Sequence, residues 1–396
     1  MDRWGGFVAT ALALWLCFTT SSLPTPIYPL YQSEWGIPPS ALTYIFTAYM
    51  VGVLPALICF GRISDTIGRF RVVLTSLCLL MAGLIISALA PNVAVLALAR
   101  FMIGFGNGLL TTAGAAALAE SHPERDRHVA AVVTSAAISI AFGLGPVLGG
   151  ALAQAGWFPL VLPYVAVLIG AAFNLVLLVR HRAMLQGPFG RRVPLSIRPQ
   201  MALPTPAKRP SFLLACAAGF ATFAVGSFFA SLVPSALRQV LPWAGPLVVG
   251  GAFLLMAIAS TFIQFVQRGI APFKGLALGM LGFAVAVGLL ALGLALHDVL
   301  VLALGMVFVG VGQGYGFMSA AVIAGLNADE HRRTANMSTY FLSSYMGATA
   351  PVIGVGLLAD KIGLSLAVDV YAAAISALLV VLALLAWRQQ GRQAAS

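Results

Sequence analysis

An arginine inside a long apolar segment is the residue of this chain that points most directly to chemistry. Arg100 lies within the apolar run 93–119, and glycines at 104, 106 and 108 follow it. A charged side chain in a bilayer is costly, so it is a functional candidate by default. The alternative is an arginine whose long side chain reaches the outer interface. The glycines are more typical of close helix packing than of ligand contact.

The carboxylates are placed very differently from this arginine. Of the eleven acidic residues, only Asp369 lies inside an apolar run, and the others fall in loops or at the ends of runs. Proton coupling needs a buried carboxylate that takes up and releases a proton, so Asp369 is the first candidate and Asp65 a weaker one. The alternative places Asp369 at the membrane interface. Without an acid to pair with, a permanent cation would be held poorly, and Arg100 favours neutral, zwitterionic or anionic compounds.

The sequence contains no set of residues typical of an enzyme active site. The five histidines lie in loops or at the ends of apolar runs. The chain contains no HExxH, GxSxG, CxxC or phosphate-binding GxxxxGK[ST] pattern. The four cysteines lie in or beside apolar runs and are expected to be buried or to face lipid. We therefore expect no enzyme, no cofactor and no metal site.

The composition places these residues in a membrane protein. The 396 residues are 60% hydrophobic and only 8% charged, whereas a soluble domain carries about 25% charged residues. A span needs about 20 apolar residues, and only helices satisfy their backbone groups here, because no barrel alternation is visible. We expect an all-α protein with twelve spans at 7–30, 40–60, 72–90, 93–119, 129–155, 157–180, 211–234, 243–267, 273–296, 299–325, 334–359 and 363–387.

A proline- and arginine-rich segment divides the spans into two sets of six. This segment, 181–210, is expected to link an N-terminal bundle, 1–180, to a C-terminal bundle, 211–396. The net charge of +11 would suggest nucleic acid in a soluble protein, but the basic residues here lie in loops. Basic residues favour the cytoplasmic side. With both termini inside, the only exceptions among the 22 Lys and Arg residues are Arg100, Arg238 and Lys361.

The two halves also repeat each other in sequence. The segment 104–108, GFGNG, matches 310–314, GVGQG, at an offset of 206 residues. Pro146 in the fifth span matches Pro351 in the eleventh at an offset of 205 residues. Parallel repeats of six spans are typical of transporters whose substrate site lies between the halves near the bilayer midplane.

The charged loop 61–71, GRISDTIGRFR, lies between the second and third spans. It resembles the signature loop of the major facilitator superfamily, G-x-L-x-D-R-x-G-R-[RK]-x. The positions that match are Gly61, Asp65, Gly68 and Arg69, whereas Thr66 and Phe70 depart from the pattern. The resemblance implies that this loop, Arg62 included, forms a cytoplasmic gate in which Asp65 contacts the start of helix 11, near 334–337. The alternative is a topology-setting loop in which Asp65 only pairs with an arginine.

Two further segments resemble the drug:proton antiporter branch of this superfamily. Arg100 and its glycines are similar to the pattern R-x-x-x-G-x-G-x-G, in which the arginine is implicated in proton coupling. The fifth span is similar to the antiporter motif of exporting branches through Gly145, Pro146, Gly149 and Gly150, with Ala141 in place of a glycine. This implies an exporter whose helix 5 packs against helix 8. The alternative is a proline kink with no bearing on direction. Related antiporters often carry an acid in helix 1 or helix 4, and this chain has none inside either span.

Tyrosines and amides within the spans are the candidates for a substrate cavity. They are Tyr28, Tyr44, Tyr49, Asn107, Gln313, Asn336, Tyr340 and Tyr345. The first span ends in the stretch 19–29, TTSSLPTPIYP, whose prolines break a regular helix. Its hydroxyls line the cavity or, alternatively, bond back to their own helix. Aromatic and neutral polar groups of this kind suit an amphipathic organic substrate.

These features together predict a secondary-active transporter that works by alternating access. The favoured form is a proton-coupled exporter of small amphipathic organic compounds, as in multidrug or metabolite efflux. The alternative is an importer or facilitator with the same fold. The expected partners are a small-molecule substrate, protons and the lipid bilayer, with no nucleic acid. We expect a monomer in the bacterial cytoplasmic (inner) membrane, with both termini cytoplasmic.

Overall fold

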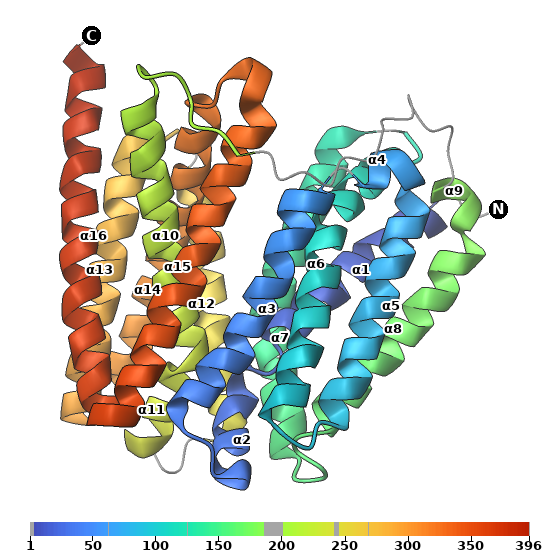
Figure 1. Ribbon diagram of the computed structural model, residues 1–396, viewed down its shortest axis with the longest axis horizontal. Helices are drawn as coiled ribbons and strands as arrows, with labels where there is room; N and C mark the ends of the chain where they lie inside the picture. Colours follow the sequence, from blue (N-terminus) through green and yellow to red (C-terminus); the bar gives the residue numbers. More distant parts are fainter. Residues whose placement is uncertain are drawn as a thin grey trace. The chain divides into compact units, whose positions relative to one another are not determined.

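The computed structural model describes residues 4–61, 63–124, 126–185, 201–240, 245–267 and 269–395. All regular secondary structure of these residues is helical (Figure 1). Twelve helices of the described chain are long and apolar enough to cross a membrane. Each coincides with one of the expected spans, so the prediction of an all-α, twelve-span membrane protein is confirmed.

The first half of the chain forms the helices α1 to α9. Their bounds are α1 Gly5–Ser22, the 3₁₀ helix η1 Thr25–Ile27, α2 Tyr28–Trp35, α3 Pro39–Phe60, α4 Ile63–Ile67, α5 Arg69–Ala88, α6 Val93–Ser121, α7 Arg127–Gln154, α8 Leu162–Arg180 and α9 Arg182–Leu185. The first span contains α1, η1 and α2 together, from Gly5 to Trp35.

The second half forms the helices α10 to α16. Their bounds are α10 Arg209–Ser231, α11 Val233–Val240, α12 Pro246–Val266, α13 Pro272–Leu296, α14 Val299–Leu326, the 3₁₀ helix η2 Glu330–Arg332, α15 Arg333–Ile362 and α16 Leu364–Ala395. Proline stands in the first turn of α10, α12 and α13, where its missing N–H costs no helical hydrogen bond.

The chain divides into two compact units. One holds Met1–Tyr31 and Tyr44–Pro199, and the other holds Gln32–Thr43 and Gln200–Ser396. The boundary near residue 200 falls inside the expected linker 181–210, of which residues 186–200 lie outside the described part of the chain. The short piece Gln32–Thr43 joins the second unit because the Ser40 backbone N–H donates to Asp360 Oδ1 at 3.2 Å.

Each unit is built around one central helix. The first span and α10 are the most buried of the described spans, with 72% of the residues of an 18-residue apolar stretch buried in each. In the first unit α1 packs against α6, α7 and α8, and in the second α10 packs against α14, α15 and α16. These two helices are the first of each six-span set, so the sequence repeat is also a structural repeat.

Glycines set the closest helix contacts, in the same way in both units. A Cβ on Gly104 would overlap the backbone of α3 at Tyr49, and a Cβ on Gly106 would approach α5. In the second unit a Cβ on Gly310 would overlap α12 and one on Gly312 would overlap Phe283 on α13. These contacts agree with the packing role expected for the glycines.

The helices that carry the repeated glycines also start in the same way. Asn92 Oδ1 accepts from the Val95 N–H at 3.0 Å and begins α6. At an offset of 206 residues, Asp298 Oδ1 accepts from Leu300 N–H at 2.8 Å and begins α14. A side-chain oxygen at this position satisfies donors that the helix leaves free.

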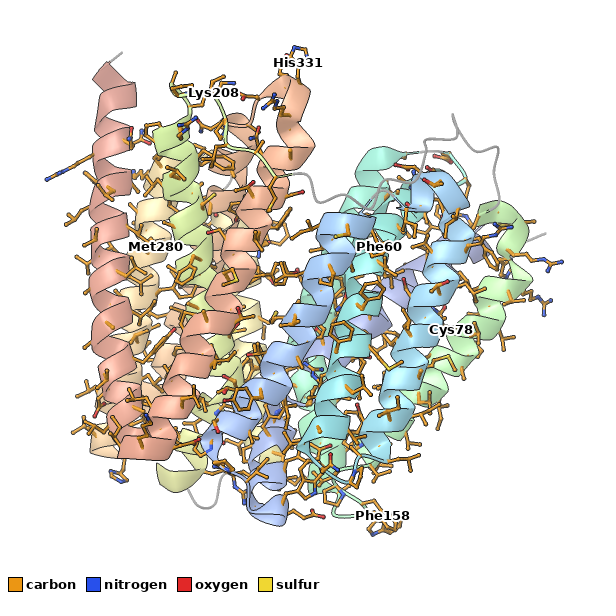
Figure 2. All side chains as sticks on the ribbon, viewed as in Figure 1. Phe60, Cys78, Phe158, Lys208, Met280 and His331 are labelled. Atoms are coloured by element: carbon orange, nitrogen blue, oxygen red, sulfur yellow. The ribbon has the colours of Figure 1, made fainter. Side chains whose placement is uncertain are left out.

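Large apolar side chains cover the outer surfaces of the helices (Figure 2). On α8 and α12 they include Ile169, Phe173, Val176, Ile258 and Phe262, each more than half exposed. Contiguous apolar surface of this extent suits contact with lipid acyl chains rather than water.

Candidate functional site

The first span is interrupted where its prolines occur. α1 ends at Ser22, and α2 begins at Tyr28 after one short 3₁₀ turn. Pro24 has no N–H, so the Thr20 carbonyl loses the donor that stands four residues later in a regular helix. The interruption therefore leaves polar backbone atoms inside the unit that need another partner.

Arg100 on α6 supplies that partner. Its Nη1 donates to the Thr20 carbonyl at 3.3 Å, and its Nη2 donates to the Ser21 carbonyl at 3.0 Å. The side chain is completely buried, and Cζ lies 4.8 Å from the centre of the Tyr49 ring. Carbonyls at a helix C-terminus and an aromatic face both attract a cation. The guanidinium thus lies at the break of the first span and does not extend to the protein surface.

A short chain of polar groups continues from this point. Asn107, one of the candidate cavity residues on α6, donates through Nδ2 to the Tyr49 hydroxyl at 2.5 Å and to the Cys17 carbonyl at 3.5 Å. Tyr28 lies at the start of α2, completely buried, within electrostatic reach of Arg100. The structure therefore brings Arg100, Tyr28, Tyr49 and Asn107 together in the first unit.

The antiporter-like motif of α7 packs on the same break. A Cβ on Gly145 would overlap the Ser22 hydroxyl, and a Cβ on Gly149 would overlap the Leu23 carbonyl. Pro146 lies inside α7, and Gly150 is buried. Ser22 Oγ donates to the Ala141 carbonyl on α7 at 3.4 Å. The small residues of the motif let α7 approach the point where α1 ends.

The gate loop forms a small charge cluster. Asp65 Oδ1 on α4 lies 2.7 Å from Arg69 Nη1, and Arg69 Nε lies 3.2 Å from Glu120 Oε1 at the end of α6. Gly68 has a φ of 96°, which a residue with a side chain rarely adopts. Gly61 ends the preceding turn, while Arg62 lies outside the described residues. Asp65 thus has the arginine partner of the simpler alternative, and its gate role stays a prediction.

The remaining candidate residues are dispersed in the structure. In the second unit Tyr345 is partly buried, with its ring 5.2 Å from that of Phe223, and Phe223 lies 6.0 Å from Phe317. Gln313 on α14 lies opposite Gly226. Tyr44 is 42% exposed on α3. Asp369 is exposed near the start of α16.

Asn336 and Tyr340 are buried at the beginning of α15, but their surroundings differ from those expected of cavity residues. Asn336 Oδ1 accepts from the Asp329 N–H at 3.0 Å, and its Nδ2 donates to the Ala202 carbonyl at 2.9 Å. Tyr340 packs against Phe341. The amide of Asn336 is thus occupied by backbone groups of the second unit.

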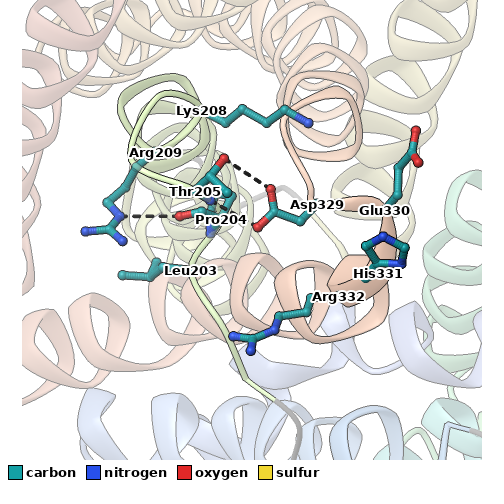
Figure 3. Close-up of a pocket in the computed structure, with 9 residues that line it drawn as sticks. All are labelled: Leu203, Pro204, Thr205, Lys208, Arg209, Asp329, Glu330, His331 and Arg332. Atoms are coloured by element: carbon teal, nitrogen blue, oxygen red, sulfur yellow. Dashed lines mark hydrogen bonds between the residues drawn. The ribbon is translucent and has the colours of Figure 1, made fainter.

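This contact ties the chain before α10 to the loop between α14 and α15. Thr205 donates to Asp329 through its backbone N–H at 3.0 Å and its hydroxyl at 3.3 Å (Figure 3). A cavity of about 530 Å³ lies here, with the residues of Figure 3 around it. Its lining residues carry both signs of charge: Lys208, Arg209 and Arg332 against Asp329 and Glu330.

Two groups of side chains in the structure were not predicted from the sequence: a buried tyrosine pair and an aromatic cluster. Tyr31 on α2 donates its hydroxyl to that of Tyr164 on α8 at 3.1 Å, and both side chains are buried. Each is an isolated tyrosine within or beside an apolar run. That isolation could have marked each of them as a buried polar group. The aromatic cluster of Phe223, Phe317 and Tyr345 had no such signal, because phenylalanine occurs 24 times in the chain.

Residues 10–348 match the family model of the Major Facilitator Superfamily. The chain belongs to this superfamily. The twelve candidate membrane spans of the described chain fit a multi-pass membrane protein of this superfamily. The membership of the chain confirms the resemblance drawn from the loop 61–71.

Two curated relatives of this superfamily member come from Mycobacterium tuberculosis. It is 24% identical over 275 residues to the "Uncharacterized MFS-type transporter EfpA", a match covering 67% of this chain and 47% of that protein. It is 29% identical over 152 residues to the "Multidrug resistance protein Stp", covering 38% of this chain and 28% of that protein. The chain spans about half the length, or less, of these curated relatives.

Solved transporters share the fold over almost the whole chain. The peptide transporter POT in complex with sulfate has a TM-score of 0.78 at 17% identity, covering 98% of this chain and 94% of that one. A bacterial homologue of the human lysosomal transporter Spinster, in an inward-facing and unoccupied conformation, has a TM-score of 0.70 at 13% identity, covering 96% and 94%. At these identities the likeness concerns the fold alone.

Proposed function

We propose that this superfamily member is a secondary-active exporter of small amphipathic organic compounds, working by alternating access. The observation that carries the proposal is the packing of the α7 motif on the break of the first span, where Gly145 and Gly149 leave no room for a side chain. A close, flat helix contact of this kind lets one helix shift past another with little rearrangement of side chains.

The name of one relative supports export, while others leave the direction open. Stp is named a multidrug resistance protein. A further relative, 23% identical over 157 residues, is the riboflavin transporter RibZ of Clostridioides difficile, a match covering 39% of this chain and 34% of that protein. An importer or facilitator of a small organic solute is the second candidate, favoured by the shared fold with a peptide transporter.

An amphipathic substrate suits the polar and aromatic groups inside the units. The second unit offers the aromatic cluster of Phe223, Phe317 and Tyr345 with Gln313 on the neighbouring turn of α14. The first offers Tyr49 and Asn107. Aromatic walls with a few neutral polar groups are typical of sites for small organic ligands.

Coupling and topology complete the proposal. Protons drive export, with Asp369, exposed near the start of α16, as the candidate coupling carboxylate and Asp65 on α4 as the gate residue. The protein acts as a monomer in the bacterial cytoplasmic membrane. Both termini lie inside, because nearly all loop arginines and lysines then face the cytoplasm. The two six-helix halves, 1–180 and 211–396, change conformation during the transport cycle.

Everted membrane vesicles test the direction of transport. Vesicles with and without the overproduced protein receive fluorescent neutral, zwitterionic and anionic amphiphiles. A proton gradient with an acidic lumen is imposed, so that protons leave the vesicle as the substrate enters. An exporter accumulates at least one dye inside everted vesicles, and an uncoupler abolishes the accumulation. Accumulation only in right-side-out vesicles would instead establish the importer, and matched vesicles carrying Asp65→Asn control for passive dye binding.

A further inference from the structure

The guanidinium of Arg100 is only partly compensated by its surroundings. Two of its nitrogens bond to the carbonyls of Thr20 and Ser21, and Tyr49 lies against its face. The Nε–H is buried and has no hydrogen-bond partner. Carbonyls at a helix end carry only a fraction of a negative charge. One donor and much of the positive charge therefore stay unmatched.

A second buried donor lies beside the guanidinium. The Tyr28 hydroxyl is fully buried and close enough to Arg100 to interact with its side chain, but its own O–H has no acceptor. Tyr31 and Tyr164 are also within electrostatic reach of Arg100. Buried polar groups are normally satisfied, so two neighbouring donors without an acceptor call for an explanation.

No carboxylate of the described first unit forms an ion pair with Arg100. Asp65 and Glu120 are engaged with Arg69 in the gate cluster. Glu120 stands twenty residues after Arg100 on the same helix, about 30 Å along its axis. At the repeat offset of 206 residues the second half has Met306 in place of the arginine. The helix packing of the repeat therefore does not itself need a charge at this position.

We propose that Arg100 and Tyr28 form a binding site for a singly charged anionic group. The group is the carboxylate of an amphipathic organic-acid substrate or an inorganic monoanion that accompanies transport. One oxygen or halide between Arg100 Nε and Tyr28 Oη satisfies both donors and neutralises the buried cation. The substrate half of this inference rests on the proposed transport function, whereas the site itself does not.

A monoanion fits this site better than a neutral or divalent ligand. A guanidinium offers its donors in the plane that a carboxylate matches. A neutral group leaves the positive charge buried without a counter-charge, which is unfavourable. A divalent anion replaces an excess of positive charge with an excess of negative charge in the same buried place.

Binding to the purified full-length protein tests the site without transport. The probes are 4-phenylbutyrate and its neutral amide, which differ in charge but not in shape, each titrated in halide-free sulfate buffer at fixed ionic strength. Sodium chloride is titrated separately. The thermal midpoint and the quenching of tryptophan fluorescence report binding. We expect the carboxylate to bind at least tenfold more tightly than the amide, or chloride to stabilise the protein at low concentration.

Two variants locate the effect. Arg100→Gln removes the charge, and Tyr28→Phe removes only the hydroxyl, which keeps the test valid if the first variant does not fold. Tyr28→Phe is expected to weaken anion binding about tenfold, because a hydrogen bond to a charged group is lost. Tyr371→Phe is the matched control, since its hydroxyl is also buried without a partner but lies in the second unit.

Each outcome decides the matter. Preference for the carboxylate that Tyr28→Phe diminishes assigns the site to a substrate carboxylate, and chloride stabilisation that the same variant diminishes assigns it to an inorganic monoanion. Equal affinity for acid and amide with no chloride effect overturns the proposal, as does an anion preference that Tyr28→Phe leaves unchanged. Failure of dye export in vesicles, with the anion preference intact, would overturn the exporter and not the site.

Discussion

The bond between Arg100 and the broken first span predicts an energetic coupling between two positions that are far apart in sequence. Arg100→Met, which introduces the residue found at the equivalent position 306, leaves the Thr20 and Ser21 carbonyls without their side-chain donor. Each buried group left unsatisfied costs about 1–3 kcal/mol. Loss of the two bonds is therefore expected to contribute about 2–6 kcal/mol of destabilisation, which is partly offset because the substitution also removes an incompletely compensated buried charge.

Pro24→Ala changes that cost in a defined way. The helix is regular up to Leu23, whose N–H donates to the Thr19 carbonyl at 2.9 Å. An alanine at position 24 therefore directs its new N–H at the Thr20 carbonyl. In this background Arg100→Met leaves only the Ser21 carbonyl unpaired. The double-mutant cycle is expected to give a coupling energy of about 1–3 kcal/mol.

Pro26→Ala is the matched control for this cycle. Its new N–H lies in the 3₁₀ turn Thr25–Ile27, past the positions whose N–H could reach the Thr20 or Ser21 carbonyl. Reversible unfolding in sodium dodecyl sulfate mixed micelles, followed by the fluorescence of the six tryptophans, gives the four free energies of each cycle. If the Pro24 and Pro26 cycles give the same small coupling, the carbonyl bonds do not stabilise the protein as the geometry indicates.

Three further substitutions test the gate, the coupling group and the helix contact. Asp65→Asn is expected to reduce transport turnover at least tenfold. Glu120→Gln is the control, because Glu120 pairs with the same Arg69 on an exposed surface, and it is expected to change turnover little. Unchanged turnover in Asp65→Asn contradicts the gate role. Asp369→Asn is expected to abolish the pH dependence of dye transport in vesicles, and a retained pH dependence removes its assignment. Gly149→Leu is expected to destabilise the protein by about 1–3 kcal/mol through overlap with α1, while the repeat counterpart Gly354→Leu, which has open space, leaves the melting temperature near that of the wild type.

Much of the fold follows from the sequence because the membrane limits the choices. Apolar runs of sufficient length become helices, since no other backbone arrangement is satisfied in lipid. The repeat 104–108 and 310–314 then fixes equivalent helices, and their glycines contact equivalent neighbours. The interruption of the first span was likewise predictable, because proline removes helical donors wherever it occurs.

The hydrogen-bond partners of the candidate residues were harder to predict from the sequence. Arg100 bonds to backbone carbonyls about eighty residues away, and every residue has a carbonyl, so no side-chain pattern marks them. Asn336 looked like a cavity residue, yet its amide holds the Ala202 carbonyl and the Asp329 N–H. Ser40 contacts the second unit through its backbone, whose N–H donates to Asp360 Oδ1. Contacts made by backbone atoms depend on tertiary structure, which local residue patterns do not reveal.

The isolation of Arg100 also has an electrical consequence. A fixed charge within the spans experiences the membrane voltage, which does about 2.3 kcal/mol of work on one elementary charge crossing 100 mV. If the first unit rocks so that Arg100 crosses a tenth of the field, the voltage biases the conformational equilibrium by about 0.2 kcal/mol. An anion bound beside it cancels that bias. The empty and the loaded carrier would then respond differently to voltage, so that the return of the empty carrier is the electrogenic step.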